Sequence, residues 1–146
     1  SLADNWYQSG TQVIFACGGE MGKSVMASAD ENDGKVIGVD VDQSGMSHSV
    51  ITSAKKMIAN AIKDTLEDYY NDRFIGGRIE LFSAANNGIG LEIDNSRFNT
   101  FSGVEYNAIY TELVDGKIVP YSETDVATTA ELDFVNVTVN YHDDGT

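Results

Sequence analysis

Two apolar runs that favour β-strands, separated by a glycine turn and a helical pattern, constrain the fold of this chain more than any other feature. The first run, residues 12–16, ends at the pair Gly18-Gly19. The second run, residues 35–40, follows the turn Asp33-Gly34. Between them, small and apolar residues recur at helical spacing over residues 22–29. A strand, a helix and a strand in so short a stretch predict a βαβ unit with two parallel strands.

The other periodic segments predict one longer helix and several short elements. An apolar stripe with a spacing of three to four residues runs over residues 50–70 and predicts an amphipathic helix, with Thr52 or Ser49 as its N-cap. Further predicted elements are strands at 78–82, 89–93 and 135–141 and a helix at 104–113. Together they predict an α/β fold: a three-layer, Rossmann-like single domain with a mostly parallel sheet and a looser C-terminal section.

The charge balance and the cysteine content exclude several classes of partner and site. Nine basic residues against 23 acidic residues give a net charge of −14 at pH 7. A field of that sign repels phosphate backbones and anionic lipid, so we expect no nucleic-acid binding. Cys17 is the only cysteine, which excludes an intrachain disulfide and a multi-cysteine zinc site. No apolar stretch approaches the ~20 residues of a membrane-spanning helix.

Residues 17–24 lie between the first predicted strand and the first predicted helix and nearly match a phosphate-binding P-loop. A P-loop opens with a glycine, so that successive backbone N–H groups surround a phosphate, and Cys17 stands at that position. A glycine turn at the carboxyl end of the strand is the other interpretation, with the helix N-terminus facing a ligand crevice. A small nucleotide-binding enzyme that uses residues 19–24, with Lys23 and Ser24 on the phosphate, stays open as an alternative function.

Asp40 is the strongest candidate for a ligand-binding side chain. It ends the second predicted strand, and ligands of parallel α/β proteins bind beyond the carboxyl ends of the strands. The Gly19 turn lies at the same edge if the two strands are neighbours. A carboxylate at this position accepts two hydrogen bonds from a vicinal diol, as in a ribose. Lys56 falls in the first turns of the predicted long helix, where a solvated lysine is the simpler interpretation.

No arrangement in the sequence favours catalysis. There is no pair of carboxylates, no cluster of metal ligands and no nucleophile at a meaningful spacing from a base. His48, one of two histidines, has no serine or cysteine partner at a meaningful spacing. We therefore predict a binding module rather than an enzyme, with no catalytic residue, no metal and no cofactor.

Six short segments, in order along residues 4–120, match the motifs of one protein family. They are residues 10–15, 19–22, 38–43, 52–56, 88–91 and 115–120. The most diagnostic are the G-V-D-x-D-Q motif at 38–43 and the T-S-x-x-K motif at 52–56. With these motifs the chain resembles the C-terminal lobe of the basic membrane protein (BMP) family. Its members are bacterial substrate-binding lipoproteins with the type 1 periplasmic-binding-protein fold.

The resemblance implies a function and a set of ligand residues. It implies capture of a purine nucleoside, or a related small molecule, by a lipid-anchored protein at the extracellular face of the membrane or in the periplasm. The ligand is then delivered to the permease of an ABC importer. In the family the turn glycine and the motif aspartate and lysine reach the ribose, roles that carry over to Gly19, Asp40 and Lys56. Glu20 replaces the family's second turn glycine, where a side chain narrows the pocket or adds an acceptor. A ligand-sensing receptor on the same fold stays open as an alternative.

The length fits one domain over residues 1–146, and the resemblance implies that this domain is the C-terminal lobe of a two-lobed solute-binding protein. A two-lobed protein of this type needs roughly twice this length or more. The resemblance therefore puts the N-terminal lobe, the opening strand of the second lobe and the aromatic residues that sandwich the base outside this chain. Because a ligand is buried between both walls of the cleft, we expect this chain alone to bind nucleoside weakly or not at all.

Overall fold

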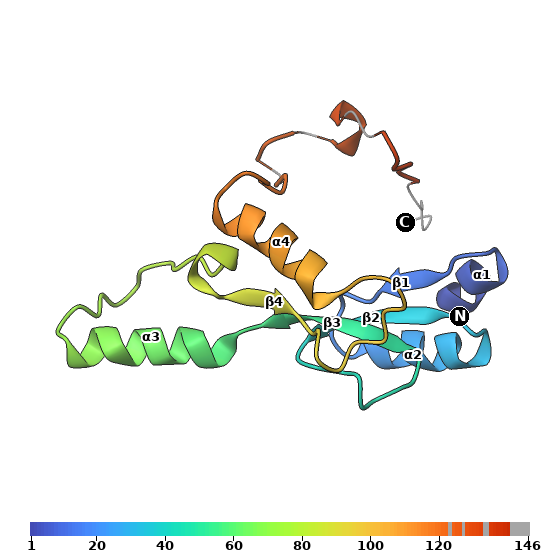
Figure 1. Ribbon diagram of the computed structural model, residues 1–146, viewed down its shortest axis with the longest axis horizontal. Helices are drawn as coiled ribbons and strands as arrows, with labels where there is room; N and C mark the ends of the chain where they lie inside the picture. Colours follow the sequence, from blue (N-terminus) through green and yellow to red (C-terminus); the bar gives the residue numbers. More distant parts are fainter. Residues whose placement is uncertain (123, 127, 133–134, 141–146) are drawn as a thin grey trace.

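The computed structural model describes residues 1–122, 124–126, 128–132 and 135–140, and these fold around one small sheet (Figure 1). The main elements are α1 (Leu2–Gln8), β1 (Val13–Phe15), α2 (Met21–Glu31), β2 (Lys35–Asp40), β3 (Val50–Lys56), α3 (Ile58–Tyr70), β4 (Ile89–Leu91) and α4 (Gly103–Val114). Two short 3-10 helices, η1 (Ala84–Asn86) and η2 (Thr129–Glu131), complete them. The strand order is β1-β2-β3-β4, with β1 to β3 parallel and β4 antiparallel to β3. The predicted α/β fold with a mostly parallel sheet is confirmed.

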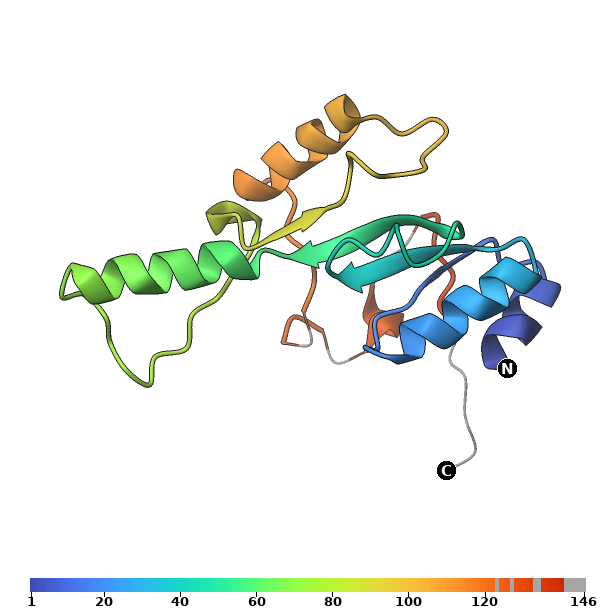
Figure 2. The same cartoon turned by 90° about the horizontal axis from the view of Figure 1, so that it is seen from below.

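The predicted βαβ unit is present, and helices lie on both sides of the sheet. β1 and β2 pair in parallel, with Ile14 opposite Val36, and α2 connects them. Helices α1 and α2 lie on one side of the sheet and α4 lies on the other (Figures 1 and 2). This gives the three layers expected of the fold class, with α3 extending away from them.

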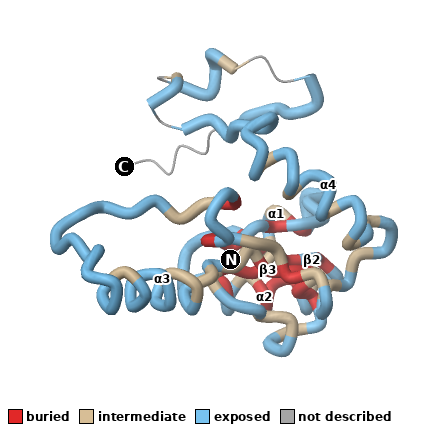
Figure 3. Tube along the Cα trace, turned by 60° about the vertical axis from the view of Figure 1, so that its left-hand side comes forward, coloured by how far each residue is buried: buried red, intermediate tan, exposed pale blue. Residues whose placement is uncertain are grey.

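The hydrophobic core lies between α1, α2 and the sheet, where the buried residues concentrate (Figure 3). Its members are Ala3, Tyr7, Ile14, Ala16, Met26, Ala29, Val36 and Val50. The Tyr7 hydroxyl donates a hydrogen bond to the backbone carbonyl of Lys35 at 2.8 Å. The Tyr7 ring covers Gly34 so closely that a Cβ there would lie 2.3 Å from a ring carbon. Helix α1 is thereby fixed against the start of β2.

The predicted helix over residues 50–70 is wrong for its first third. Residues Val50–Lys56 form β3, and the helix is limited to Ile58–Tyr70. The start of this segment is rich in β-branched residues, which pack well in a sheet. A strand buried on both faces lacks the alternation that separates a strand from a helical stripe. The proposed cap is also wrong, because the Thr52 hydroxyl donates to the backbone carbonyl of Glu92 at 2.6 Å.

Two predicted strands are not formed in the described part of the chain. Residues 78–82 and 135–140 are irregular, and Tyr141, the last residue of the second prediction, lies outside the described residues. Both segments alternate apolar and polar residues, but a strand also needs a neighbour to satisfy its backbone groups. The sheet of described residues ends at β1 and β4 and offers neither segment a partner. The predictions at 89–93 and 104–113 are confirmed as β4 and α4.

Hydrogen bonds of its own glutamine, Gln43, hold the G-V-D-x-D-Q segment against β3. The Gln43 side-chain oxygen accepts a hydrogen bond from the Val39 N–H at 3.1 Å, and the Gln43 N–H donates to the Ser53 hydroxyl at 3.0 Å. A Cβ at Gly38 would lie 2.6 Å from Gln43 Oε1 and 2.7 Å from Ser53 Oγ. The glycine of the motif therefore makes room for this contact between β2 and β3.

A buried ion pair fixes the chain that follows β4 against β3. Lys55 Nζ lies 2.6 Å from Glu92 Oε2, and the Glu92 side chain is 7% exposed. The Asn95 N–H donates to the other carboxylate oxygen at 3.0 Å. The hydrogen bond from Lys55, followed by that from Asn95, lowers the pKa of Glu92. The pair therefore stabilises the fold only while Glu92 is ionised.

We predict that Gly38→Ala lowers the free energy of unfolding by about 1–3 kcal/mol, the usual cost of overpacking a filled site. Urea unfolding measures this change. Gly45→Ala is the matched control, because a Cβ at Gly45 meets nothing within 4 Å. Equal unfolding midpoints for the two variants would contradict the packing role given to Gly38.

We predict that Glu92→Gln removes part of the acid sensitivity of the fold. Because the folded-state pKa of Glu92 lies below its ordinary value of 4.5, its contribution is present above that pH and is lost as the pH falls through the lower value. The variant should be less stable than wild type at pH 7, by about 1–2 kcal/mol, and the difference should shrink in acid. Thermal unfolding from pH 7 to pH 3 measures this, with Glu112→Gln on α4 as the control. A pH-independent difference would refute the ionic role.

Candidate functional site

The carboxyl ends of β1, β2 and β3 lie at one edge of the sheet, and the four predicted site residues end these strands or follow them. β1 leads into the turn that contains Gly19, β2 ends at Asp40 and β3 ends at Lys56. The three strands are parallel neighbours, so their carboxyl ends point the same way. Ligands of parallel α/β sheets bind at this edge.

Asp40 and Lys56 form an ion pair, the closest contact within the predicted site. Lys56 Nζ lies 2.8 Å from Asp40 Oδ1, and the side chains are 67% and 44% exposed. The pKa of Lys56 is raised, first by hydrogen bonding to Asp40 and then by its charge, and Cys17 after β1 adds a smaller contribution. Asp40 Oδ1 itself is shielded from solvent, so a ligand can reach the Lys56 ammonium and the remaining, exposed part of the Asp40 side chain.

The backbone at Asp40 adopts a conformation that is uncommon for a residue with a side chain. Its φ is 71°, and the Val41 N–H donates to the Val39 carbonyl at 2.9 Å, which makes a γ-turn centred on Asp40. A non-glycine residue in such a conformation costs of order 1–3 kcal/mol, and such residues cluster at functional sites. The turn ends β2 and directs the carboxylate toward Lys56.

The Gly19 turn and Glu20 occupy the rim next to this pair. Gly19 has a φ of 60°, which favours glycine, and its carbonyl accepts a hydrogen bond from the Gly22 N–H at 3.0 Å. Glu20 is the N-cap residue of α2, and its side chain, 86% exposed, pairs with Lys23 at 2.6 Å. The Lys23 ammonium, which the P-loop alternative needs for phosphate, is thus held by the carboxylate of its own helix.

The position of Lys56 differs from the sequence prediction. It ends β3 rather than lying in the first turns of a helix. Because successive side chains of a strand point to opposite faces, Lys56 reaches Asp40 while Lys55 reaches Glu92. Because Lys56 ends a strand and does not belong to a helix, it lies at the edge of the sheet beside Asp40, where the site was predicted.

The second aspartate of the motif has a structural role. Asp42 accepts hydrogen bonds from the Ser44 N–H and from the Asn95 side chain, both at 2.9 Å. Arg97 donates to the carbonyls of Val50 at 2.6 Å and Ser44 at 3.0 Å. These contacts fix the loop between β2 and β3, so Asp40 is the aspartate left for a ligand.

An open apolar groove of about 450 Å³ begins beside Lys56 and was not predicted. It lies between the face of the sheet that carries α4 and α4 itself. Residues on its walls include Val39, Ala54, Leu91, Phe101, Tyr106 and Ile109. Phe101 and Tyr106 are visible in the sequence as aromatic residues, but nothing in the sequence placed them near Lys56. The groove joins an apolar surface to the charged pair at the edge of the sheet.

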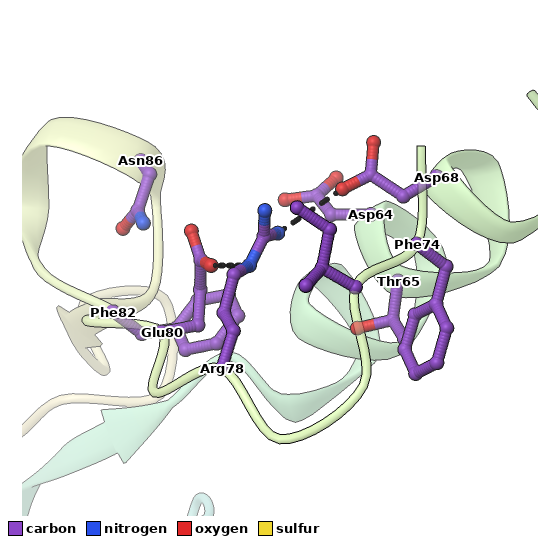
Figure 4. A pocket seen from close by; sticks show the side chains of 9 residues that line it. Asp64, Thr65, Asp68, Phe74, Arg78, Glu80, Phe82 and Asn86 are labelled. Atoms are coloured by element: carbon purple, nitrogen blue, oxygen red, sulfur yellow. Dashed lines mark hydrogen bonds and ion pairs between the residues drawn. The ribbon is translucent and has the colours of Figure 1, made fainter. Parts of the chain in front are cut away.

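A second cavity, of about 260 Å³, lies between α3 and the chain that follows it (Figure 4). Three of its charged side chains pair with one another: Arg78 contacts Asp68 at 3.2 Å and Glu80 at 2.6 Å. Its walls contain none of the predicted site residues. We therefore take the edge with Asp40 and Lys56, and not this cavity, as the candidate site.

The helices and the titratable side chains of the described part of the chain bear on two further kinds of site, a membrane span and a metal centre. None of its helices combines the length and the apolar character needed to cross a bilayer. Nowhere in it do three histidine, cysteine or acidic side chains gather closely enough to bind a metal ion. Asp40 and Glu92 form ion pairs with Lys56 and Lys55, respectively.

Comparisons with known proteins give the family. Residues 1–119 match the family model Bmp, described as ABC transporter substrate-binding protein PnrA-like. The chain is 29% identical over 136 residues to the ABC transporter nucleoside-binding protein BmpA of Lactococcus lactis subsp. cremoris (strain MG1363), covering 81% of this chain and 38% of that protein. It is 31% identical over 131 residues to Basic membrane protein D of Borreliella burgdorferi (strain JD1), covering 84% of this chain and 38% of that protein. The chain thus spans 38% of the length of each of these relatives.

Solved structures agree on the fold. A transcriptional activator of the comK gene from Bacillus halodurans superposes with a TM-score of 0.60 at 13% identity, over 78% of this chain and 39% of that one. An ABC transporter solute-binding protein from Conexibacter woesei DSM 14684 gives a TM-score of 0.59 at 21% identity, over 82% of this chain and 40% of that one. Identities this low show the fold alone. The family match, however, covers most of the sequence, and the chain therefore belongs to the Bmp family of PnrA-like ABC transporter substrate-binding proteins.

Proposed function

We propose that this chain is the C-terminal lobe of a two-lobed solute-binding protein and forms one wall of a purine nucleoside site. The observation that carries the proposal is the Asp40–Lys56 ion pair at the carboxyl edge of the parallel sheet. Family membership supports the solute-binding role, and the name of the Lactococcus relative supports a nucleoside as the ligand. The protein would deliver its ligand to the permease of an ABC importer, as a lipid-anchored protein outside the membrane.

The ion pair matches the chemistry of a ribose. An ionised carboxylate accepts hydrogen bonds only, so Asp40 suits the two hydroxyl donors of a vicinal diol. The Lys56 ammonium donates only and suits a hydroxyl or ring oxygen of the same sugar. With the two groups 2.8 Å apart, one sugar edge contacts both without moving either strand. Hydrogen bonds to charged groups contribute about 1.5–3 kcal/mol each, enough to orient a small ligand.

The surroundings of the pair suit the other parts of a nucleoside. The groove beside Lys56 offers an apolar surface with Phe101 and Tyr106, against which a flat heterocycle can pack. On the opposite flank, the Gly19 turn allows a ligand to approach the backbone, because a Cβ there would meet nothing within 4 Å. Glu20 pairs with Lys23 through one carboxylate oxygen and is 86% exposed, so we assign it to the rim of the site.

The exposure of the pair supports the one-wall architecture. Ligand sites bury most of the surface of a small molecule, whereas Asp40 and Lys56 are 44% and 67% exposed at the edge of an open groove. A second lobe opposite this edge would close the site. The length of the relatives leaves room for such a lobe, since this chain spans 38% of each.

We predict that Asp40→Asn, in the polypeptide with both lobes, weakens adenosine and guanosine binding. Loss of the charged acceptor should cost about 1.5–3 kcal/mol, which corresponds to a roughly 10- to 100-fold higher Kd. Isothermal titration calorimetry measures the change. Asp33→Asn is the matched control, because Asp33 also has a positive φ but lies in the turn before β2, with its side chain fully exposed. Unchanged affinity in Asp40→Asn would remove Asp40 from the site.

We predict that residues 1–146 alone bind adenosine and guanosine weakly or not at all. One wall leaves most of the ligand in contact with water, so the hydrogen bonds to Asp40 and Lys56 compete with solvent. The same calorimetric titration on the isolated chain tests this. Saturable binding at micromolar or tighter affinity would show that one lobe suffices and would contradict the one-wall architecture.

A further inference from the structure

The carboxyl edge of the sheet presents its candidate ligand groups in a fixed order. Because the strand order is β1-β2-β3-β4, the Gly19 turn after β1 comes first, Asp40 at the end of β2 second and Lys56 at the end of β3 third. The apolar groove, whose walls include residues of β3 and β4, comes last. Neighbouring strands lie about 4.8 Å apart, so the turn that continues β1 begins about one strand spacing from Asp40.

A nucleoside carries its parts in the same order. Its heterocycle and its 5′ carbon leave the ribose ring on opposite sides, and the vicinal diol lies between them. With the heterocycle against the groove and the diol on the Asp40–Lys56 pair, the 5′ carbon points toward β1. The Gly19 turn and the residues that follow it therefore face whatever group the ligand carries at its 5′ position.

The backbone of this turn suits a hydrogen-bond acceptor on the ligand. Gly19 has a φ of 60°, and the N–H groups of Gly19 and Glu20 donate to no other group in the part of the chain that the structure describes. The turn leads into α2, a helix of 11 residues, whose N-terminus carries a partial positive charge. Backbone of this kind commonly binds a phosphate, which is also the chemistry that the near match to a P-loop at residues 17–24 indicates.

The side chains of the turn oppose an anion. Glu20 places a carboxylate at the N-terminus of α2, and this carboxylate pairs with Lys23 at 2.6 Å. The charge of Lys23 is thereby balanced within the chain, as the charge of Lys56 is balanced by Asp40. A phosphate at the turn would lie near two carboxylates whose lysines are already paired. The net charge of −14 adds to the repulsion.

We propose that Glu20 is a specificity-determining residue, which admits uncharged nucleosides and rejects ligands that carry a phosphate at the 5′ position. The inference rests on the proposed nucleoside function and adds to it the group that the ligand must lack. The free N–H groups of the turn donate to a neutral 5′-hydroxyl oxygen, whereas the Glu20 carboxylate repels the phosphate that would replace it. Glu20 thus selects the ligand by a repulsive element and not by an added contact.

The test compares adenosine with adenosine 5′-monophosphate, in the polypeptide with both lobes, by isothermal titration calorimetry without added divalent metal. In the wild type, the monophosphate should have the higher Kd. Glu20→Gln should lower the ratio of the two Kd values by at least ~10-fold, because it removes the repulsion and leaves the Lys23 ammonium free to pair with the phosphate. High salt should lower the wild-type ratio, because it screens repulsion between exposed charges.

Glu31→Gln is the matched control for this test. Glu31 is the last residue of α2 and is exposed, so the variant removes the same charge from the same helix, at the end away from the site. At 1.5 Å per residue, the two ends of α2 lie about 15 Å apart. The ratio of the two Kd values in Glu31→Gln should therefore stay close to that of the wild type.

Four results would overturn the role of Glu20. They are a wild type that binds both compounds equally well, a ratio that Glu20→Gln leaves unchanged, an equal change in Glu31→Gln, and a wild-type ratio that salt does not affect. The proposed function is judged separately. Failure of adenosine to bind the wild type would refute the nucleoside site and this inference with it, whereas adenosine binding with an unchanged ratio in Glu20→Gln would refute the role of Glu20 alone.

Discussion

The close contact between β2 and β3 at Gly38 is the constraint on which the candidate site depends. Gln43 and Ser53 both lie close to this glycine and hydrogen-bond to each other, and these contacts join β2 and β3 in the observed register. In that register Asp40 stands opposite Lys55, and the next residue, Lys56, reaches back to Asp40. The position of the charged pair therefore depends on the packing of β2 against β3. Most residues of the G-V-D-x-D-Q motif have structural roles, and they position one carboxylate, that of Asp40, at the edge of the sheet.

The sequence predicted the βαβ unit and the position of Asp40 well, because both depend on local signals. β1, α2 and β2 are separated by glycine turns, and their apolar runs are short enough to have one interpretation. β3 was missed because it is buried on both faces: Val50, Thr52 and Ser53 are all buried, so its pattern imitates a helical stripe. The Thr52 hydroxyl hydrogen-bonds to the Glu92 carbonyl, and the Ser53 hydroxyl accepts a hydrogen bond from the Gln43 N–H. No local sequence pattern reveals these partners. The groove with Phe101 was missed for the same reason.

Burial is unequal on the two sides of the sheet. The side with α1 and α2 holds the core, where side chains such as Val36 and Ala29 are completely buried. The side with α4 keeps an open groove, and α3 has no buried residue. The hydrophobic core of the described residues therefore lies on one side of the sheet. The candidate ligand pair and the exposed apolar surfaces lie on the other side or at the ends of the sheet.

The γ-turn at Asp40 has a consequence for how such a site changes during evolution. Aspartate, asparagine and glycine tolerate a positive φ best, and single-nucleotide changes in an aspartate codon produce both of the others. Position 40 can therefore lose its charge, or its side chain, in one mutational step while the turn itself persists. A lineage can in this way exchange the proposed sugar-binding carboxylate for a neutral side chain, or for glycine, without first evolving a new loop. The ligand preference at this edge of the sheet can therefore change while the fold stays the same.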